Sequence, residues 1–338
     1  MKKGNSFKIT SMLFSLLFLA GTAGMAGAME FIAIGDTPYS PKEDKRIKAE
    51  IAPAIRKYNP PLLVHHGDLF AGDEACSEDL FRERLDQARG LLPGRVFYTP
   101  GDNEWTDCDR TKKTGQSLSE LSMLGYIRRY IVEKPVNLPK DWNYEIQPNF
   151  PENARWIKDG VIFITVHLVS TNNGRMEILK DDMEAALSLV DARDHANRTW
   201  INESFEAASK MDAKAAVIVT QADVTSPDGG GPCTNANRSQ CDAFLTFREN
   251  LKIAAGGFKG GWDKPLKPVL FLHGDTNPFC MDREFGGKTA PNLWRLNAWG
   301  DFKAPVDATV VTVSPENGND PFSARTLIGN VSPDAGCD

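Results

Sequence analysis

Four apolar segments of the sequence each end in a Gly-Asp pair, and this repeated feature constrains the fold more than any other. The segments FIAIGD, LLVHHGD, VFYTPGD and PVLFLHGD end at Asp36, Asp68, Asp102 and Asp275. Short runs rich in Val, Ile, Leu and Phe are typical of β-strands that are buried on both faces. A buried carboxylate costs free energy unless it is paired, hydrogen-bonded or bound to a cation. If the four strand ends converge, they predict a site that holds positive charge.

Other segments indicate how these strands are connected. Further strand-like runs are GVIFITVHLVS, AAVIVTQAD and ATVVTVS, and residues 41–58 and 182–211 carry apolar residues near helical spacing with exposed charge. Strands that alternate with helices predict an α/β fold with a mixed or mostly parallel sheet. In such sheets ligands gather at the carboxyl ends of the strands. The Gly-Asp pairs lie at those ends.

The N-terminal residues predict export. Lysines at positions 2, 3 and 8 precede an apolar stretch at 12–20 and small residues up to Ala28. This order is typical of a secretory signal peptide, so we expect residues 1–28 to be removed. No Cys stands directly after that point, and no later run reaches the ~18 apolar residues of a membrane span. We therefore expect a periplasmic or secreted protein without a membrane anchor.

The rest of the chain reads as one domain with an acidic surface. No linker, charge block or repeat divides residues 29–338, which favours a single domain. The formal net charge is −6, and it becomes −9 without the three lysines of the signal segment. Nucleic acids and anionic membranes bind basic faces, so neither is an expected partner. The sequence leaves the oligomeric state open.

Six cysteines follow the signal segment, where export places them in an oxidising compartment. They form no C-x-x-C motif, which favours three disulfides over a zinc or redox site. Cys233 and Cys241 bracket a polar loop and are expected to pair. Cys76 and Cys108 follow two Gly-Asp strand ends, and a bond between them would join those loops. The connectivity otherwise stays open.

The order of the polar motifs resembles that of the calcineurin-like metallophosphoesterases, the superfamily that includes purple acid phosphatases. The motifs GDTPY, GDLF, GDNEW, TQAD and HGDTN span most of the chain after residue 28. The resemblance implies an α/β fold with a four-layer α-β-β-α sandwich of the metallo-dependent phosphatase type. It also implies hydrolysis of a phosphate ester by a metal-bound hydroxide, with Asp36 on the first metal and Asp68 bridging two metals.

The sequence departs from the family where the family has histidine. Pro38 stands in place of the His of the first motif, and it has no side-chain donor atom. Alignment on Gly101 places Asp102 at the metal-binding Asn and Asn103 at the catalytic His. A shift of one residue makes Asn103 the metal ligand instead. Both alignments leave the third motif without an imidazole.

The last two motifs depart in the same way. Gln221 stands at the position of the later His, and Asp275 and Asn277 stand where two further histidines are expected. The metal ligands that the resemblance implies are therefore Asp36, Asp68, Asp102, Asn103, Gln221, Asp275 and Asn277.

The loss of imidazoles leaves two functions open. Oxygen ligands suit Mn²⁺, Mg²⁺ or Ca²⁺ better than Zn²⁺ or iron, so the chain is expected to use a hard divalent ion. One interpretation is a hydrolase adapted to such an ion, acting on a phosphoester or another small molecule. The alternative is a catalytically decayed protein that keeps the fold as a binding module.

The five histidines receive different predictions. His273 adjoins the last Gly-Asp pair, and it is the best acid–base candidate, with an orienting or purely structural role as the alternative. His65 and His66 point to opposite faces of a strand, so at most one of them approaches the site. His167 is expected to make a structural hydrogen bond. His195 is expected on a helix surface.

Overall fold

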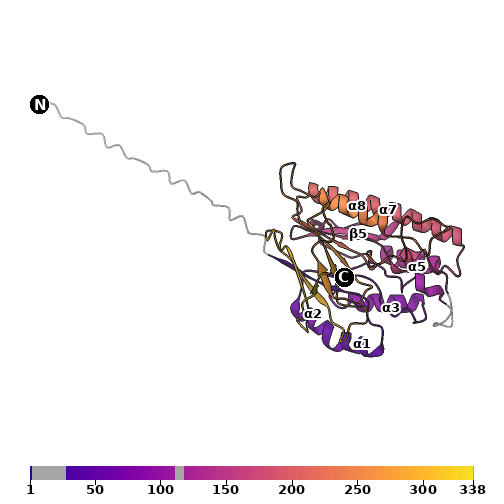
Figure 1. Ribbon diagram of the computed structural model, residues 1–338. Helices are drawn as coiled ribbons and strands as arrows, with labels where there is room; N and C mark the ends of the chain where they lie inside the picture. The colour runs from indigo at the N-terminus through magenta and orange to yellow at the C-terminus, as the bar shows by residue number, and fades with distance from the viewer. Residues whose placement is uncertain (2–27, 111–117, 338) are drawn as a thin grey trace.

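The computed structural model describes residues 1, 28–110 and 118–337; the body of the predicted signal peptide lies outside the described residues. Two β-sheets pack face to face, with helices on both outer faces (Figure 1). These four layers confirm the predicted α/β fold class, and they form the architecture that the resemblance to metallophosphoesterases implies.

The smaller sheet carries the first three Gly-Asp motifs. Its strand order is β12-β11-β1-β2-β3. The bounds are β1 Met29–Ile34, β2 Leu63–His65, β3 Val96–Tyr98, β11 Thr309–Val313 and β12 Phe322–Thr326. Strands β1, β2 and β3 are parallel, whereas β11 runs antiparallel to both β1 and β12. The carboxyl ends of the three parallel strands therefore share one edge.

The larger sheet has the order β13-β9-β10-β8-β7-β6-β5-β4. The bounds are β4 Glu145–Gln147, β5 Phe150–Lys158, β6 Val161–Thr165, β7 Ala215–Val219, β8 Val269–His273, β9 Cys280–Asp282, β10 Leu293–Asn297 and β13 Asp334–Ala335. Strands β6, β7, β8 and β10 are parallel, so the TQAD and HGDTN motifs follow neighbouring strands at the same edge.

The two predicted helical segments are present. Residues 41–58 form α1 Pro41–Arg46, a π-helical turn Ile47–Ile51 and α2 Ala52–Tyr58, and residues 182–211 contain α7 Met183–Lys210. The side chains of Ser40 and Asp182 accept hydrogen bonds from backbone N–H groups in the first turns, which explains where α1 and α7 begin. The other helices are α3 Glu78–Arg89, α5 Glu120–Glu133 and α8 Leu245–Gly256, with short 3₁₀ turns at Thr106–Asp109 and Lys140–Trp142.

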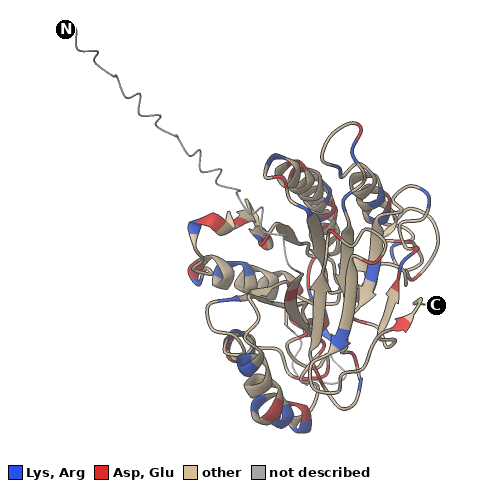
Figure 2. Ribbon diagram, turned by 90° about the vertical axis from the view of Figure 1, so that its left-hand side faces the viewer, with Lys and Arg blue, Asp and Glu red and all other residues tan. Residues whose placement is uncertain are grey.

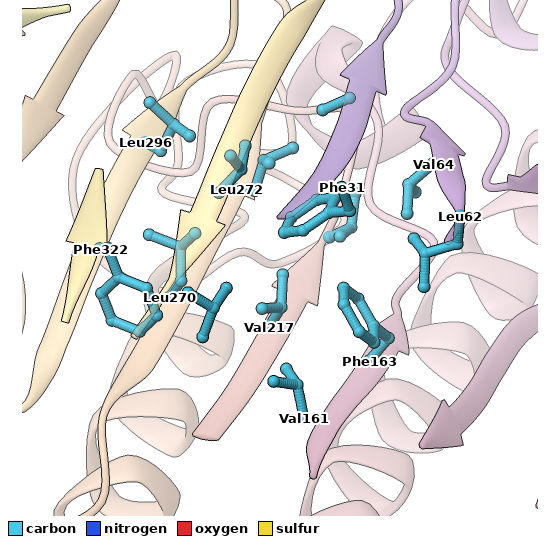
Figure 3. Close-up of a cluster of buried hydrophobic side chains, with 14 of the residues drawn as sticks. Phe31, Leu62, Val64, Val161, Phe163, Val217, Leu270, Leu272, Leu296 and Phe322 are labelled. Atoms are coloured by element: carbon cyan, nitrogen blue, oxygen red, sulfur yellow. The ribbon is translucent and has the colours of Figure 1, made fainter. Parts of the chain in front are cut away.

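The main core lies between the sheets. Phe31 of β1 packs edge-on against Phe163 of β6, with ring centroids 5.1 Å apart, and apolar side chains of β7 and β8 continue the layer (Figure 3). Helices α7 and α8 cover the outer face of the larger sheet, and α1 and α2 cover the smaller one (Figure 1). Because both faces of the central strands are buried, polar residues gather at strand ends. Charged residues lie mostly on helices and loops (Figure 2).

All six cysteines are paired, which confirms the prediction of three disulfides. The bonds are Cys76–Cys108, Cys233–Cys241 and Cys280–Cys337. The first joins the loops after β2 and β3, as expected, and the third ties β9 to the C-terminal segment. Among the described residues, the helices include none that is long and apolar enough to cross a membrane.

Candidate metal centre

The carboxyl edges of the two sheets meet, and the predicted aspartates gather there. Asp36, Asp68 and Asp102 follow β1, β2 and β3, while Asp275 follows β8 of the other sheet. A cavity of about 390 Å³ opens at this junction. Six of its lining residues are aspartates: Asp68, Asp73, Asp102, Asp107, Asp275 and Asp301. A larger cavity of about 470 Å³ lies between α1 and residues 303–306, and it includes none of the predicted site residues.

Direct contacts join the strand ends across the junction. The backbone N–H of Asp275 donates to Oδ1 of Asp36 over 3.2 Å. The side-chain amide of Gln221, after β7, donates to Oδ1 of Asp102 over 2.9 Å and to Oδ2 of Asp68 over 3.4 Å. Tyr39 donates its hydroxyl to Oδ2 of Asp68 over 2.8 Å. The structure therefore brings five predicted residues together, namely these four aspartates and Gln221.

The glycines of the Gly-Asp pairs are explained by close packing between motifs. A Cβ atom on Gly101 would lie 2.0 Å from Oδ1 of Asp68, and one on Gly274 would lie 2.1 Å from Oδ2 of Asp36. Each glycine thus lets its backbone approach a carboxylate that another strand delivers. A larger residue at either position would displace that carboxylate.

Three of the aspartates share an unusual backbone conformation. The φ angles of Asp36, Asp68 and Asp275 are 51°, 56° and 69°, in the left-handed region. Asp tolerates this region better than most residues, and strained backbone of this kind is often found at functional sites. The turn ends each strand abruptly and directs the carboxylate into the junction.

Glu104 holds two of the loops together, although the sequence analysis did not single it out. It is buried, and its carboxylate accepts backbone N–H bonds from Asp68 (3.2 Å), Leu69 (2.8 Å) and Gly101 (3.0 Å). Burial raises its pKa to about 7. Its position in the GDNEW motif, directly after Asn103, is the sequence feature that could have identified it.

Among the described residues, acidic side chains far outnumber basic ones in this cluster. Burial raises the pKa of Asp36, Asp68 and Asp275 well above the ordinary value, and the neighbouring carboxylates raise it further. Burial and the charge of Asp102 raise the pKa of Asp301 to about 6. Arg110 is the one cation among the described residues that line the cavity, and it pairs with Asp107 and Glu177.

The donor chemistry fits a hard divalent cation. Oδ2 of Asp36 is buried and has no hydrogen-bond partner among the described residues. Nδ1 of His66 lies 3.5 Å away, but burial lowers the pKa of His66 well below its usual value, so the ring stays neutral. Within the described residues, however, no three His, Cys, Asp or Glu side chains are already arranged as a coordination group. Asp68, Asp102 and Asp275 share one cavity, with Asp36 next to it, but their side chains do not form a closed ligand set.

Asn103 lines the cavity with its side-chain oxygen available. Its Nδ2 donates to the carbonyl of Phe70 over 2.9 Å, and its backbone N–H donates to Oδ1 of Asp68 over 3.3 Å. A Cβ on Gly72 would lie 2.7 Å from Oδ1 of Asn103, so that oxygen faces a residue with no side chain. Asp102 and Asn103 both reach the cavity, and the choice between the two alignments stays open.

Gln221 points its amide nitrogen toward the aspartates, whereas a metal ligand would need to point its amide oxygen there. Its Oε1 accepts the backbone N–H of Ser170 over 3.1 Å, which turns its NH₂ group toward Asp68 and Asp102. In this structure Gln221 is a hydrogen-bond donor to the carboxylates, and its oxygen points away from them, toward Ser170.

His273, the predicted acid–base candidate, does not line the cavity. Its ring is buried, Nε2 accepts from Arg295 over 2.8 Å, and Nδ1 donates to the carbonyl of Gly274 over 2.7 Å. Arg295 also donates to Asp223 over 2.8 Å. The geometry agrees with the orienting role, because this network lies directly behind the loop of Asp275. Burial lowers the pKa of His273 to about 4.

Asn277 does not join the cluster. Its side chain is exposed, and it is not among the cavity-lining residues. The resemblance to the metallophosphoesterases implied a ligand here, but the chain turns outward beyond Asp275.

The other histidines lie as the sequence predicts. His66 approaches Asp36, whereas Nδ1 of His65 accepts the backbone N–H of Gly67 over 3.3 Å. His167 is buried against Glu152, with 3.1 Å between Nδ1 and Oε1. His195 is exposed on α7.

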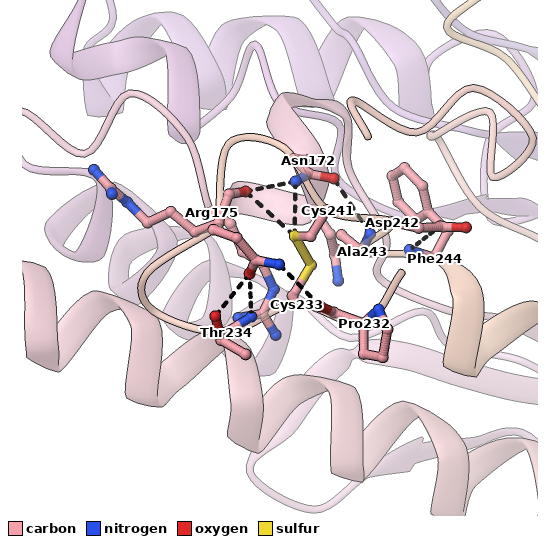
Figure 4. Close-up of a disulfide and its surroundings, with 12 residues drawn as sticks. Asn172, Arg175, Pro232, Cys233, Thr234, Cys241, Asp242, Ala243 and Phe244 are labelled. Atoms are coloured by element: carbon pink, nitrogen blue, oxygen red, sulfur yellow. Dashed lines mark hydrogen bonds between the residues drawn. A yellow bond between two sulfur atoms is a disulfide. The ribbon is translucent and has the colours of Figure 1, made fainter. Parts of the chain in front are cut away.

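A left-handed turn behind Gln221 connects the site to a disulfide loop. Thr171, Asn172 and Asn173 have φ angles of 57°, 52° and 59°. The side chain of Asn172 donates to the carbonyl of Arg238 over 2.6 Å and accepts from the backbone of Ala243, beside the Cys233–Cys241 bond (Figure 4). The preceding Ser170 is the donor that orients Gln221. The sequence Asn172-Asn173-Gly174 is typical of a turn, but the sequence alone does not show that this turn orients Gln221.

Comparisons with known proteins add little beyond the general architecture. No protein-family model matches the chain, and no curated protein matches it. Among solved structures it is similar to GAP50, the anchor in the inner membrane complex of Plasmodium, with a TM-score of 0.44, 11% identity and coverage of 90% of this chain and 86% of that one. It is also similar to a dimetal phosphatase from Danio rerio, with a TM-score of 0.43, 10% identity and coverage of 89% and 96%.

A third similar structure is the NAD nucleotidase of Haemophilus influenzae, with a TM-score of 0.42 and 13% identity. The similarity covers 88% of this chain but 55% of the nucleotidase. With TM-scores below 0.5, these likenesses assign no chemistry to this chain, which must be inferred from its own residues.

Proposed function

We propose that this chain is an exported, metal-dependent phosphoesterase. The observation that supports this best is the convergence of four aspartates without a matching set of cations from the described residues. Asp68, Asp102 and Asp275 line one cavity, and Asp36 is buried next to it, in contact with the backbone of Asp275. Converging carboxylates repel one another, and divalent ions relieve that repulsion. The cavity, about 390 Å³, is of a size that accommodates a small phosphate ester.

Several side chains have roles that follow from their contacts. The four aspartates and the oxygen of Asn103 would hold the cation, which when bound polarises the phosphoryl group and activates water. Tyr39 stays protonated, because burial and the charge of Asp68 raise its pKa well above 10, and it orients Asp68. Arg110 lies on the cavity wall, where a guanidinium can bind a phosphate oxygen.

The proposed ion is Mn²⁺, Mg²⁺ or Ca²⁺ rather than Zn²⁺ or iron. Carboxylate and amide oxygens suit hard ions, and no imidazole lines the cavity in the described residues. Elemental analysis after dialysis should find little zinc, and calorimetry should detect binding of Mn²⁺, Mg²⁺ or Ca²⁺. Stoichiometric, tightly held zinc or iron would contradict this choice.

A second candidate is a binding protein that has lost hydrolysis. The observation that favours it is the engagement of Asp68 and Asp102 by hydrogen-bond donors from Gln221 and Tyr39, which use oxygens that could otherwise bind metal. A screen of phosphate monoesters and diesters with each ion separates the two candidates. Turnover that EDTA abolishes supports the hydrolase, whereas metal binding without turnover supports the binding protein.

Export is part of the proposal. The three disulfides are consistent with an oxidising compartment, and the predicted signal peptide supplies the route. N-terminal sequencing of the protein recovered from the periplasm or medium should begin at Met29. Recovery of the intact N-terminus from the cytoplasm would contradict export.

A further inference from the structure

An exposed aromatic side chain stands at the mouth of the candidate metal centre. Phe302 is 75% exposed, yet it lines the same cavity as Asp68, Asp102 and Asp275. Large apolar side chains exposed singly are common on protein surfaces. This one differs because of where it lies and how it is held.

The loop that carries Phe302 is anchored against the carboxylate cluster. A Cβ atom on Gly300 would lie 2.9 Å from Oδ2 of Asp36, so the base of the loop packs directly on that carboxylate. The backbone N–H of Trp299 donates to Thr309 over 2.9 Å, and the N–H of Lys303 donates to the carbonyl of Gly300 over 2.8 Å. The first bond fixes the start of the loop beside β11, and the second closes the loop into a tight turn next to the site.

The backbone directs Phe302 outward at a conformational cost. The φ angles of Asp301 and Phe302 are 25° and 60°, both in the left-handed region, which a bulky residue seldom adopts. Strain of this kind at a cavity rim points toward function rather than toward folding alone. Apolar burial does not explain it, because the ring remains largely in solvent.

The Phe302 ring makes an aromatic pair that leads into the site. It contacts Tyr39 with centroids 5.3 Å apart and a tilt of 54°, and Tyr39 in turn donates to Asp68. A flat ring placed against Phe302 would thus sit at the cavity entrance, with its substituent directed toward the aspartates. Aromatic faces stack well on planar rings and bind them with little dependence on sequence or substituent.

We infer that Phe302 forms a binding subsite for the planar ring of a phosphate ester, either an aryl group or a nucleobase, whose phosphate enters the carboxylate cavity. This inference rests on the proposed function for the phosphate, but the subsite for the ring can be tested without hydrolysis. The expected substrates are phosphate esters that carry a planar ring, and sugar phosphates or short alkyl phosphates should bind more weakly.

Binding of adenosine, which has no phosphate, tests the subsite directly. Ligand-observed NMR on the purified, disulfide-bonded chain measures its dissociation constant. We expect Phe302→Ala to raise that constant about tenfold, Phe302→Leu to raise it nearly as much, and Phe302→Tyr to preserve it. Trp262→Ala is the matched control, because Trp262 is 88% exposed and lies in the loop before β8, at the opposite edge of the sheet.

Substrate comparison gives the second measurement. The ratio of KM values for ribose 5-phosphate and adenosine 5′-monophosphate should fall about tenfold in Phe302→Ala, and the ratio for ribose 5-phosphate and 4-nitrophenyl phosphate shows whether an aryl ring suffices. Equal adenosine affinity in the wild type and Phe302→Ala would overturn the inference, as would no adenosine binding by the wild type. Adenosine binding that depends on Phe302 without any hydrolysis would keep the subsite and refute the hydrolase instead.

Discussion

Two buried carboxylates in this molecule have opposite electrostatic surroundings. Glu152 is 1% exposed and Asp68 is 3% exposed. Although burial alone raises the pKa of Glu152, hydrogen bonds and charge from His167 and Arg128 lower it to about 2. For Asp68, burial and the charges of Asp102 and Glu104 all raise the pKa. The described residues neutralise Glu152 with a cation of their own, whereas they leave Asp68 to protons or to an external cation.

Asp223, which lies behind the candidate site, is neutralised by a basic side chain in the same way as Glu152. Asp223 accepts from Arg295 over 2.8 Å, and although burial raises its pKa, His273 and Arg295 lower it below the ordinary value. The chain can therefore place a buried arginine next to a buried carboxylate when the fold needs one. Among the described residues no arginine or lysine pairs with Asp36, Asp68 or Asp275, and this difference separates a structural ion pair from a site for a ligand.

The largest expected effect on stability comes from removing the charge of Glu152, the carboxylate that the protein neutralises with its own residues. Glu152→Gln keeps the shape but leaves Arg128 and His167 without their anion, and loss of one partner of a buried pair should reduce the free energy of unfolding by about 3 kcal/mol. Asp68→Asn, measured in EDTA at pH 8, should change it by less than about 1 kcal/mol, because it removes a repelled charge. Urea unfolding compares the two variants, and equal losses would contradict the distinction.

A smaller effect should follow from filling the space beside Asp68. Gly101→Ala places a Cβ 2.0 Å from Oδ1 of Asp68, and such overpacking should destabilise the chain by about 1–3 kcal/mol and weaken metal binding. Gly230→Ala is the control, since a Cβ there meets nothing within 4 Å. Thermal unfolding of both variants checks this, and an equal change would show that the packing around Asp68 is not tight.

The smallest expected effect concerns pH. The pKa of Asp301 rises from 3.8 to about 6 on folding, so its contribution to stability is fully present below pH 3.8 and is lost as pH rises through 6. Asp301→Asn removes that loss. In EDTA its melting temperature should exceed that of the wild type by roughly 2 °C at pH 8 and by about half as much at pH 5. A larger gain in melting temperature at pH 5 than at pH 8 would contradict a raised pKa for Asp301.

Sequence was sufficient for the features that repeat. Four Gly-Asp strand ends indicated both the buried strands and the meeting of their carboxylates, because the carboxyl ends of parallel strands share an edge. The disulfides Cys76–Cys108 and Cys233–Cys241 followed from the position of their loops. These inferences needed no side-chain detail.

Sequence was insufficient where a contact depends on how a loop turns. Asp301 and Phe302 follow no motif, and only the anchored loop after β10 brings them to the cavity. The ring of His273 could point either way until Arg295 and Gly274 fixed both nitrogens. Asn277 had the right spacing, but the turn after Asp275 carries it away from the site.

Asp68→Asn tests the central claim, that the uncompensated carboxylates hold a cation, most directly. Calorimetric titration with Mn²⁺ at pH 7.5, together with the Mn²⁺-induced rise in melting temperature, measures binding to the native state. Asp307→Asn is the matched control, because Asp307 is equally buried but accepts backbone N–H bonds from Ala308, Ile328 and Gly329, away from the cavity. We predict that Asp68→Asn loses most Mn²⁺ binding while Asp307→Asn keeps it. Equal Mn²⁺ stabilisation of the wild type and Asp68→Asn would contradict the claim.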